Sequence, residues 1–122
     1  ESSLINPPMK QKIEGGKKAV VKDPIFKAKI EVTFGKIERL DINKNFGAYF
    51  ERTEVLGGTT SYRIHFDYYG FTAVVHECHH ATFAILSDRG IHLDESTKEV
   101  YAYYLDWLSG ECRDLLEIWN KK

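Results

Sequence analysis

Residues 76 to 80 read His-Glu-Cys-His-His, and His76, Glu77 and His80 within them have the spacing HExxH. Four residues make about one helical turn, so on a helix the two histidines share a face and can bind the same metal ion. Neutral imidazoles suit zinc, and zinc-dependent hydrolysis needs a base beside the metal-bound water. The pentad therefore predicts one Zn2+ per chain, with His76 and His80 as ligands and Glu77 as the general base.

A simpler interpretation has to be weighed against the metal site, because short motifs also match by chance. In it, one histidine is buried with a hydrogen-bond partner and its neighbours are exposed. Ionisable groups on a mostly apolar helix need a compensating partner, and a metal ion supplies one for two imidazoles. His79 and Cys78 are expected to be bystanders, because the helix turns about 100° per residue and carries them away from the metal.

Two helices are predicted around the motif. The first spans 72–88 and is apolar nearly all round, which indicates burial, with Gly90 as its C-terminal cap. The second begins at Ser96 or Thr97 and ends at Trp119. Its predicted core-facing stripe comprises Val100, Tyr103, Tyr104, Trp107, Leu108, Leu115 and Trp119.

The first half of the chain reads as strands. Apolar and polar residues alternate through 26–34, which predicts a strand that Gly35 ends, and 36–42 is a weaker strand candidate. Segments 46–55 and 60–67 flank Gly57-Gly58, a hairpin signal. The fold class is therefore α+β: a small, mostly antiparallel sheet of three to four strands, then the helix with the motif and a long C-terminal helix.

Length and composition indicate a single domain over residues 1–122, with 43% hydrophobic residues. The net charge of -1 divides into an excess of about four positive charges in residues 1–40 and five negative charges in the rest. Without a dense basic run, nucleic-acid binding is not expected. No apolar run has the length of a membrane span and no signal-peptide core is visible, so the expected location is the cytoplasm, with Cys78 and Cys112 as free thiols.

The segment TAVVHECHHATFAIL, followed by EVYAYYLDWL, resembles zincin metallopeptidases of the gluzincin type. It is especially similar to small HExxH proteins of bacteriophages and prophages, in which a VHExxHA helix precedes a Gly-bearing turn and a Glu-x-x-Ala-Tyr helix. The matching residues lie within about 60–110. The resemblance implies that Glu99 is the third zinc ligand and that a Tyr, His or Arg stabilises the oxyanion; Tyr68, Tyr69, Arg89, His92, Tyr101, Tyr103 and Tyr104 are all open for that role.

Two alternatives to Glu99 as a ligand stay open. Ser96 to Glu99 fits a capping box, in which Glu99 bonds the Ser96 backbone instead of a metal. His92, twelve residues after His80, would give an all-histidine site, although its spacing fits such patterns poorly.

The function predicted is peptide-bond hydrolysis by a zinc-bound water that Glu77 deprotonates. By the resemblance, a peptide or protein substrate lies extended along an edge strand of the sheet, and Ser61 to Asp67 is the expected edge. The alternative is a zinc-binding phage accessory, structural or regulatory protein on the same scaffold without general hydrolytic activity. Retention of Glu77 favours hydrolysis, because a purely structural zinc needs no base.

Overall fold

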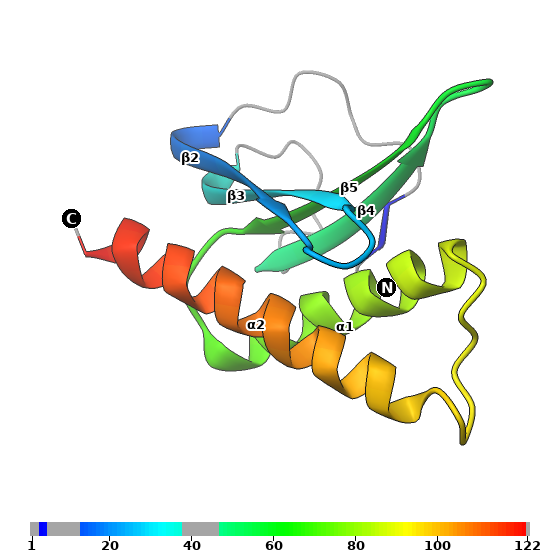
Figure 1. Cartoon of the computed structure of the whole chain (residues 1–122). Helices are drawn as coiled ribbons and strands as arrows, with labels where there is room; N and C mark the ends of the chain where they lie inside the picture. The colour runs from blue at the N-terminus through cyan, green and yellow to red at the C-terminus, as the bar shows by residue number, and fades with distance from the viewer. Residues whose placement is uncertain (1–2, 5–12, 38–46, 122) are drawn as a thin grey trace.

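A computed structural model describes residues 3–4, 13–37 and 47–121 of the chain (Figure 1). Strands come first and two long helices follow, which confirms the predicted α+β class. The strands are β1 Ser3–Leu4, β2 Ile13–Lys22, β3 Lys29–Ile37, β4 Ala48–Glu54 and β5 Thr60–Phe66, and the helices are α1 Phe71–Asp88 and α2 Lys98–Asn120.

The strands form one mixed sheet in the order β1-β4-β5-β3-β2. The hairpin predicted around Gly57-Gly58 is confirmed: β4 and β5 pair antiparallel, and Gly57 takes a φ of 70° in the turn. β2 and β3 form a second antiparallel hairpin. The two hairpins join through a parallel pairing of β3 with β5, in which Val32 faces Ile64. Parallel β1 completes the sheet beside β4.

Three details of the predicted sheet were wrong. Gly35 does not end its strand, because β3 continues to Ile37. The long strand β2, with the sequence IEGGKKAVVK, was not predicted. Segment Ser61 to Asp67 is not an edge, because β5 lies between β4 and β3 and pairs with both. Of the weaker candidate at 36–42, residues 38–42 lie outside the described residues, and the first two belong to β3.

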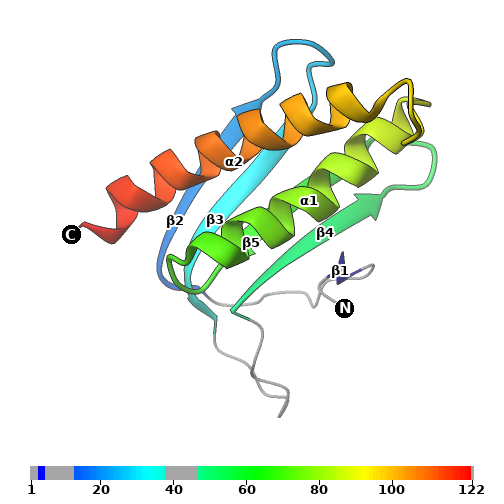
Figure 2. The same cartoon turned by 90° about the horizontal axis from the view of Figure 1, so that it is seen from below.

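Both helices cover the same face of the sheet (Figures 1 and 2). Seen from the helix side, they run antiparallel and side by side, with α1 along β4 and β5 and α2 along β3 and β2. The core lies between this helix pair and the sheet. Its fully enclosed side chains include Ile30, Val32, Ile64, Phe66, Cys78, Ile85, Leu86, Leu108, Cys112 and Leu116.

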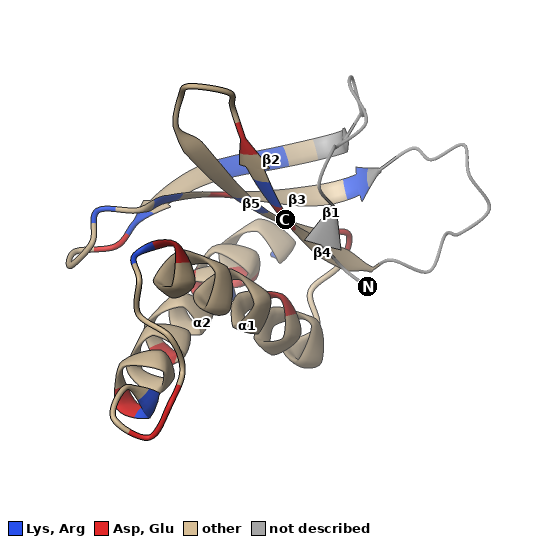
Figure 3. Cartoon of the chain, turned by 90° about the vertical axis from the view of Figure 1, so that its right-hand side faces the viewer, with Lys and Arg blue, Asp and Glu red and all other residues tan. Residues whose placement is uncertain are grey.

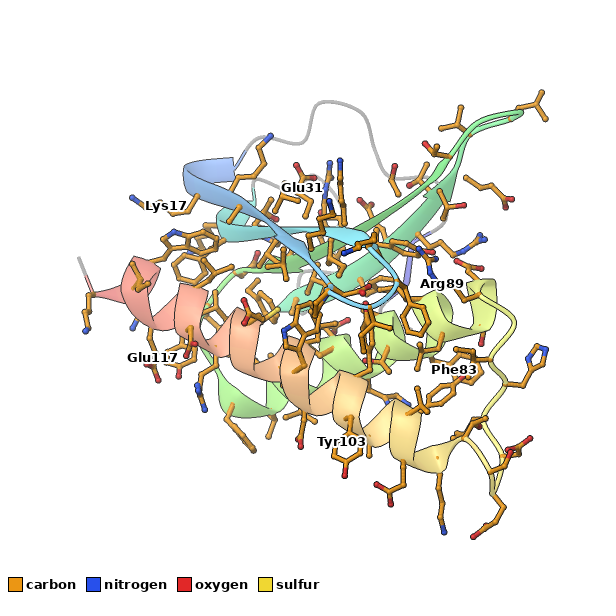
Figure 4. All side chains as sticks on the ribbon, in the orientation of Figure 1. Lys17, Glu31, Phe83, Arg89, Tyr103 and Glu117 are labelled. Atoms are coloured by element: carbon orange, nitrogen blue, oxygen red, sulfur yellow. The ribbon has the colours of Figure 1, made fainter. Side chains whose placement is uncertain are left out.

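The core-facing stripe of α2 was predicted only in part. Tyr104 and Leu108 are buried as expected, whereas Val100 and Tyr103 are 40% and 70% exposed. Figure 4 shows the Tyr103 ring pointing away from the sheet. Trp107, Leu115 and Trp119 are partly buried and pack against the core, as predicted. The buried face also includes Tyr101, Cys112 and Leu116, which were not predicted to belong to it.

A buried carboxylate fixes α2 to the β2–β3 hairpin. Asp23 is 1% exposed, and its Oδ1 accepts backbone N–H bonds from Ile25, Phe26 and Lys27. Its Oδ2 accepts the Ala28 N–H at 3.0 Å and the Tyr104 hydroxyl at 2.8 Å. One side chain therefore closes the turn between two strands and binds the long helix.

The predicted cap of α1 is confirmed in detail. Gly90 has a φ of 79°, its N–H bonds Ser87 O, and the Ile91 N–H bonds Leu86 O, which is a Schellman motif. A Cβ added at Gly90 meets nothing within 4 Å, so only the backbone conformation opposes a side chain there.

We expect Gly90→Ala to lower the free energy of unfolding by about 1 kcal/mol, because a left-handed conformation is costly for a residue with a Cβ. Gly110→Ala is the matched control: this glycine lies inside α2, also has open space around its Cβ position, and has no positive φ. The control should stabilise the chain by roughly 0.5–1 kcal/mol. Chemical denaturation of both variants would test the pair, and equal effects would contradict the assigned cap.

Candidate metal centre

α1 brings the two motif histidines together on its outer face. Their Nε2 atoms lie 3.3 Å apart, and their rings meet edge to face with centroids 4.8 Å apart. His76 is exposed and His80 is partly buried. Cys78, between them in sequence, is fully buried in the core, about 160° from each histidine around the helix. The imidazoles therefore project from the side of α1 that faces away from the sheet.

The spacing of the two nitrogens fits a shared zinc ion. Two imidazole ligands at the usual Zn–N distance of about 2.0–2.1 Å, on a tetrahedral centre, lie about 3.3–3.4 Å apart. The same separation also suits a hydrogen bond between a protonated Nε2 and an unprotonated one. Two histidines in this arrangement can hold a metal, but a stable site needs a further protein ligand.

Glu77 differs from its histidine neighbours in its surroundings. It is 3% exposed and lies on the buried part of α1, about 100° around the helix from His76. A carboxylate beside a metal-bound water and shielded from bulk solvent is well placed to take a proton from that water. The motif therefore has the His76 and His80 imidazoles on the outer face of α1 and the Glu77 carboxylate buried.

Glu99, the ligand predicted by the resemblance, lies in the first turn of α2 and is exposed. His92 lies in the loop between the helices and is also exposed. Within residues 3–4, 13–37 and 47–121, no three His, Cys, Asp or Glu side chains are grouped so that they could hold a metal ion. The structure therefore brings His76 and His80 together, and neither Glu99 nor His92 joins them in it.

The capping alternative for Glu99 is not the arrangement seen at the start of α2. The N-terminal cap position is Thr97, and the Ser96 N–H bonds Asp94 Oδ1 at 2.9 Å. Asp94 Oδ1 also accepts the Thr97 N–H at 3.1 Å. Asp94, which was not predicted to take part, therefore accepts the Ser96 N–H that Glu99 would accept in a capping box.

Most aromatic candidates for an oxyanion donor have structural partners. The Tyr101 hydroxyl donates to Ile91 O at 2.6 Å, and the Tyr69 hydroxyl donates to Glu117 at 3.0 Å. Tyr104 is bonded to Asp23. Tyr68 and Tyr103 are largely exposed. No described hydrogen bond engages the hydroxyl of either of these two tyrosines.

The cysteines have no place in the candidate centre. Cys78 and Cys112 are both buried and not joined by a disulfide. Their side chains form a hydrogen bond, and this bond together with burial raises the pKa of the Cys112 thiol. A thiol held in its neutral form in the core is a poor metal ligand. The contact between Cys78 and Cys112 lies instead in the core, where α1 packs against α2.

Polar side chains also gather on the opposite face of the sheet, where Figure 4 labels Glu31. Arg63 bridges Glu31 at 2.8 Å and the buried Glu51 at 3.1 Å. Burial raises the pKa of Glu51, and the Arg63 guanidinium offsets this only in part. A cavity of about 950 Å³ is lined by these three residues, but none of the HExxH residues lines it. This cluster is therefore separate from the candidate metal centre.

Charges are unevenly distributed over the described part of the chain. Figure 3 shows Lys and Arg along β2 and β3, and Asp and Glu at intervals along the helices and the loop between them.

None of the described helices is both long and apolar enough to cross a bilayer. No protein-family model, curated protein or solved structure matches the chain.

Proposed function

We propose that this chain is a zinc-dependent peptidase of the HExxH type. The observation that carries the proposal is the pair of Nε2 atoms of His76 and His80, 3.3 Å apart on the outer face of α1, together with the burial of Glu77, the residue that follows His76. This is the combination that metal-assisted hydrolysis needs: ligands for the ion and a base for its water. A purely structural zinc would leave the enclosed Glu77 without a chemical role.

In this proposal His76 and His80 hold the metal with one further ligand from the chain, and zinc when bound supplies a water of lowered pKa and polarises the substrate carbonyl. Glu77 accepts the proton from that water and later delivers it to the departing amine. A peptide substrate lies along β4 beyond Phe50 and Glu51, the two residues of this strand that pair with β1, and main-chain pairing gives it affinity. Ser3–Leu4 pairs with Phe50 and Glu51 on this strand.

The proposal predicts about one zinc per chain. Zinc at 100 times its dissociation constant should raise the free energy of unfolding by about 2.7 kcal/mol, because it binds only the folded chain. Thermal denaturation with zinc and with a chelator, together with elemental analysis, would measure this. His76→Ala and His80→Ala should abolish the shift.

His79→Ala is the matched control for these two variants, because His79 is an exposed histidine on the same helix whose ring lies 6.1 Å from that of His80. Its zinc-dependent shift should match that of the wild type. A wild-type chain that melts at the same temperature with and without zinc would refute the proposed function, and would leave the His76–His80 contact as a simple hydrogen bond.

A further inference from the structure

Strand β2 ends the sheet on the side opposite β1, so one of its edges has no neighbour among the described strands. Hydrogen-bonded and non-bonded pairs alternate along an antiparallel ladder, and the Asp23 N–H bonds Ala28 O just beyond the last pair of β2 with β3. Counting back from Asp23, every second residue therefore bonds β3, and the residues between them turn their N–H and C=O groups to the open edge. These outward residues are Lys18, Val20 and Lys22.

A groove runs beside this edge on the face of the sheet that the helices cover. Its volume is about 370 Å³, and Ala19 and Val21 line its β2 side. Trp107, Glu111 and Leu115 line its α2 side four residues apart, so they form one stripe along the helix. Trp107 and Leu115 are only partly buried, so their apolar surface stays open to an added side chain. A strand added to β2 would place every second side chain in this groove.

Lysines dominate the charge of the open edge. Residues 17–22 of β2 contain three lysines and no acid, and Figure 3 shows basic residues along this strand. Lys18 bridges Glu31 at 3.4 Å, but such a pair on the surface adds little stability. Among the described residues, no ion pair engages Lys17 or Lys22. Two copies of this edge would oppose lysine to lysine, which is repulsive, whereas an acidic strand is attracted.

We propose that this edge binds an extended peptide segment with the pattern acidic, apolar, any residue, apolar, acidic. The two acids lie opposite Lys18 and Lys22 on the face away from the helices, and the two apolar residues enter the groove beside Ala19 and Val21. Backbone hydrogen bonds to the outward groups of β2 give affinity. Glu111 in the groove disfavours an acid at either apolar position.

This site is separate from the proposed zinc centre. The two motif histidines lie on α1, which packs along β4 and β5, whereas β2 lies beyond β3 and is covered by α2 (Figure 2). The peptide bound at β2 is therefore a partner and not the substrate of the proposed peptidase. Because the site does not depend on zinc, it can be tested on the metal-free chain.

Hydrogen exchange measured by NMR tests the strand addition. In the free chain the Lys18, Val20 and Lys22 amides should exchange at least about tenfold faster than those of Ala19 and Val21, which already bond β3. The probe is the peptide Ser-Glu-Leu-Thr-Leu-Glu-Ser, blocked at both ends. In large excess it should slow the three outward amides by more than about tenfold, because each gains an acceptor. Unchanged exchange at these amides would overturn the proposal. Slow exchange in the free chain would also overturn it, because the edge would then be covered already, by a second copy or by other residues.

Charge reversal tests the acidic pattern. The matched peptide Ser-Lys-Leu-Thr-Leu-Lys-Ser keeps the apolar residues and should bind at least about tenfold more weakly. Lys18 and Lys22 are exposed, so the double variant Lys18→Glu/Lys22→Glu should fold like the wild type and prefer the lysine peptide. Fluorescence polarisation of labelled peptides would measure the affinities. Equal affinity of the wild type for both peptides would overturn the proposal, and so would an unchanged preference in the double variant.

Discussion

Replacing Glu77 by Gln should abolish peptide hydrolysis while leaving zinc binding intact. The amide preserves the size of an almost fully enclosed side chain but cannot accept the proton from the metal-bound water. Loss of general-base catalysis corresponds to a rate reduction of about 10²–10⁴-fold. Cleavage of an unbiased peptide mixture, followed by mass spectrometry, would measure the rate, and elemental analysis of the same preparation would measure the zinc.

Glu51→Gln is the matched control for this experiment. Glu51 is also 3% exposed, so the substitution makes the same change at the same degree of burial, but it lies on the opposite face of the sheet with Arg63. This variant should cleave at the wild-type rate. Equal residual cleavage by wild type and Glu77→Gln would indicate a contaminating peptidase, and loss of zinc in Glu77→Gln would assign Glu77 a place among the ligands instead of the role of base.

Local signals in the sequence were sufficient for the helices and for one hairpin. Glycine at a left-handed position ends α1, and the Gly57-Gly58 pair joins β4 to β5 as predicted. β2 escaped prediction because Gly15-Gly16 and Lys17-Lys18 break its alternation, and the register with β3 shifts between Glu14 and Lys17. Such a strand is specified by its partner more than by its own pattern.

The pairing of β3 with β5 could not be predicted from either strand alone. It is parallel and joins segments about thirty residues apart, with Ile30 facing Tyr62. Both strands carry the alternation of a sheet with one buried face, which does not distinguish an edge strand from a central one. The expectation that Ser61 to Asp67 forms an edge failed for this reason.

The histidine pair followed from spacing alone, because four residues on a helix fix their separation. The third ligand does not follow from spacing in the same way, because it lies on another element. Glu99 lies in the first turn of α2, beyond the end of α1 at Asp88 and the loop that follows it. The position of that turn relative to the histidines depends on how the two helices pack, which short-range spacing does not fix. Glu99 as a zinc ligand therefore stays a prediction of the resemblance.

The largest expected effect on stability comes from Asp23. Burial by itself raises the pKa of this carboxyl, but the Tyr104 hydroxyl and the backbone N–H groups of Phe26, Ala28 and Lys27 together outweigh burial and hold the pKa below its ordinary value. A depressed pKa in the folded state contributes stability that is fully present above the unfolded-state value of 3.8 and is lost as the pH falls through the folded-state value. Wild-type stability should therefore decline below about pH 4.

Asp23→Ala should lower the free energy of unfolding at neutral pH by about 3–5 kcal/mol, because it leaves partly buried backbone donors and the Tyr104 hydroxyl without their acceptor. Tyr104→Phe removes one of these bonds and should cost only about 1–1.5 kcal/mol. Asp23→Asn keeps the shape of the side chain but has no titrating group, so the component of acid destabilisation that belongs to Asp23 should disappear with it. Urea unfolding of the three variants between pH 3 and pH 7 would separate these contributions. An Asp23→Ala chain as stable as the wild type would show that packing alone, and not this carboxylate, holds α2 against the β2–β3 hairpin.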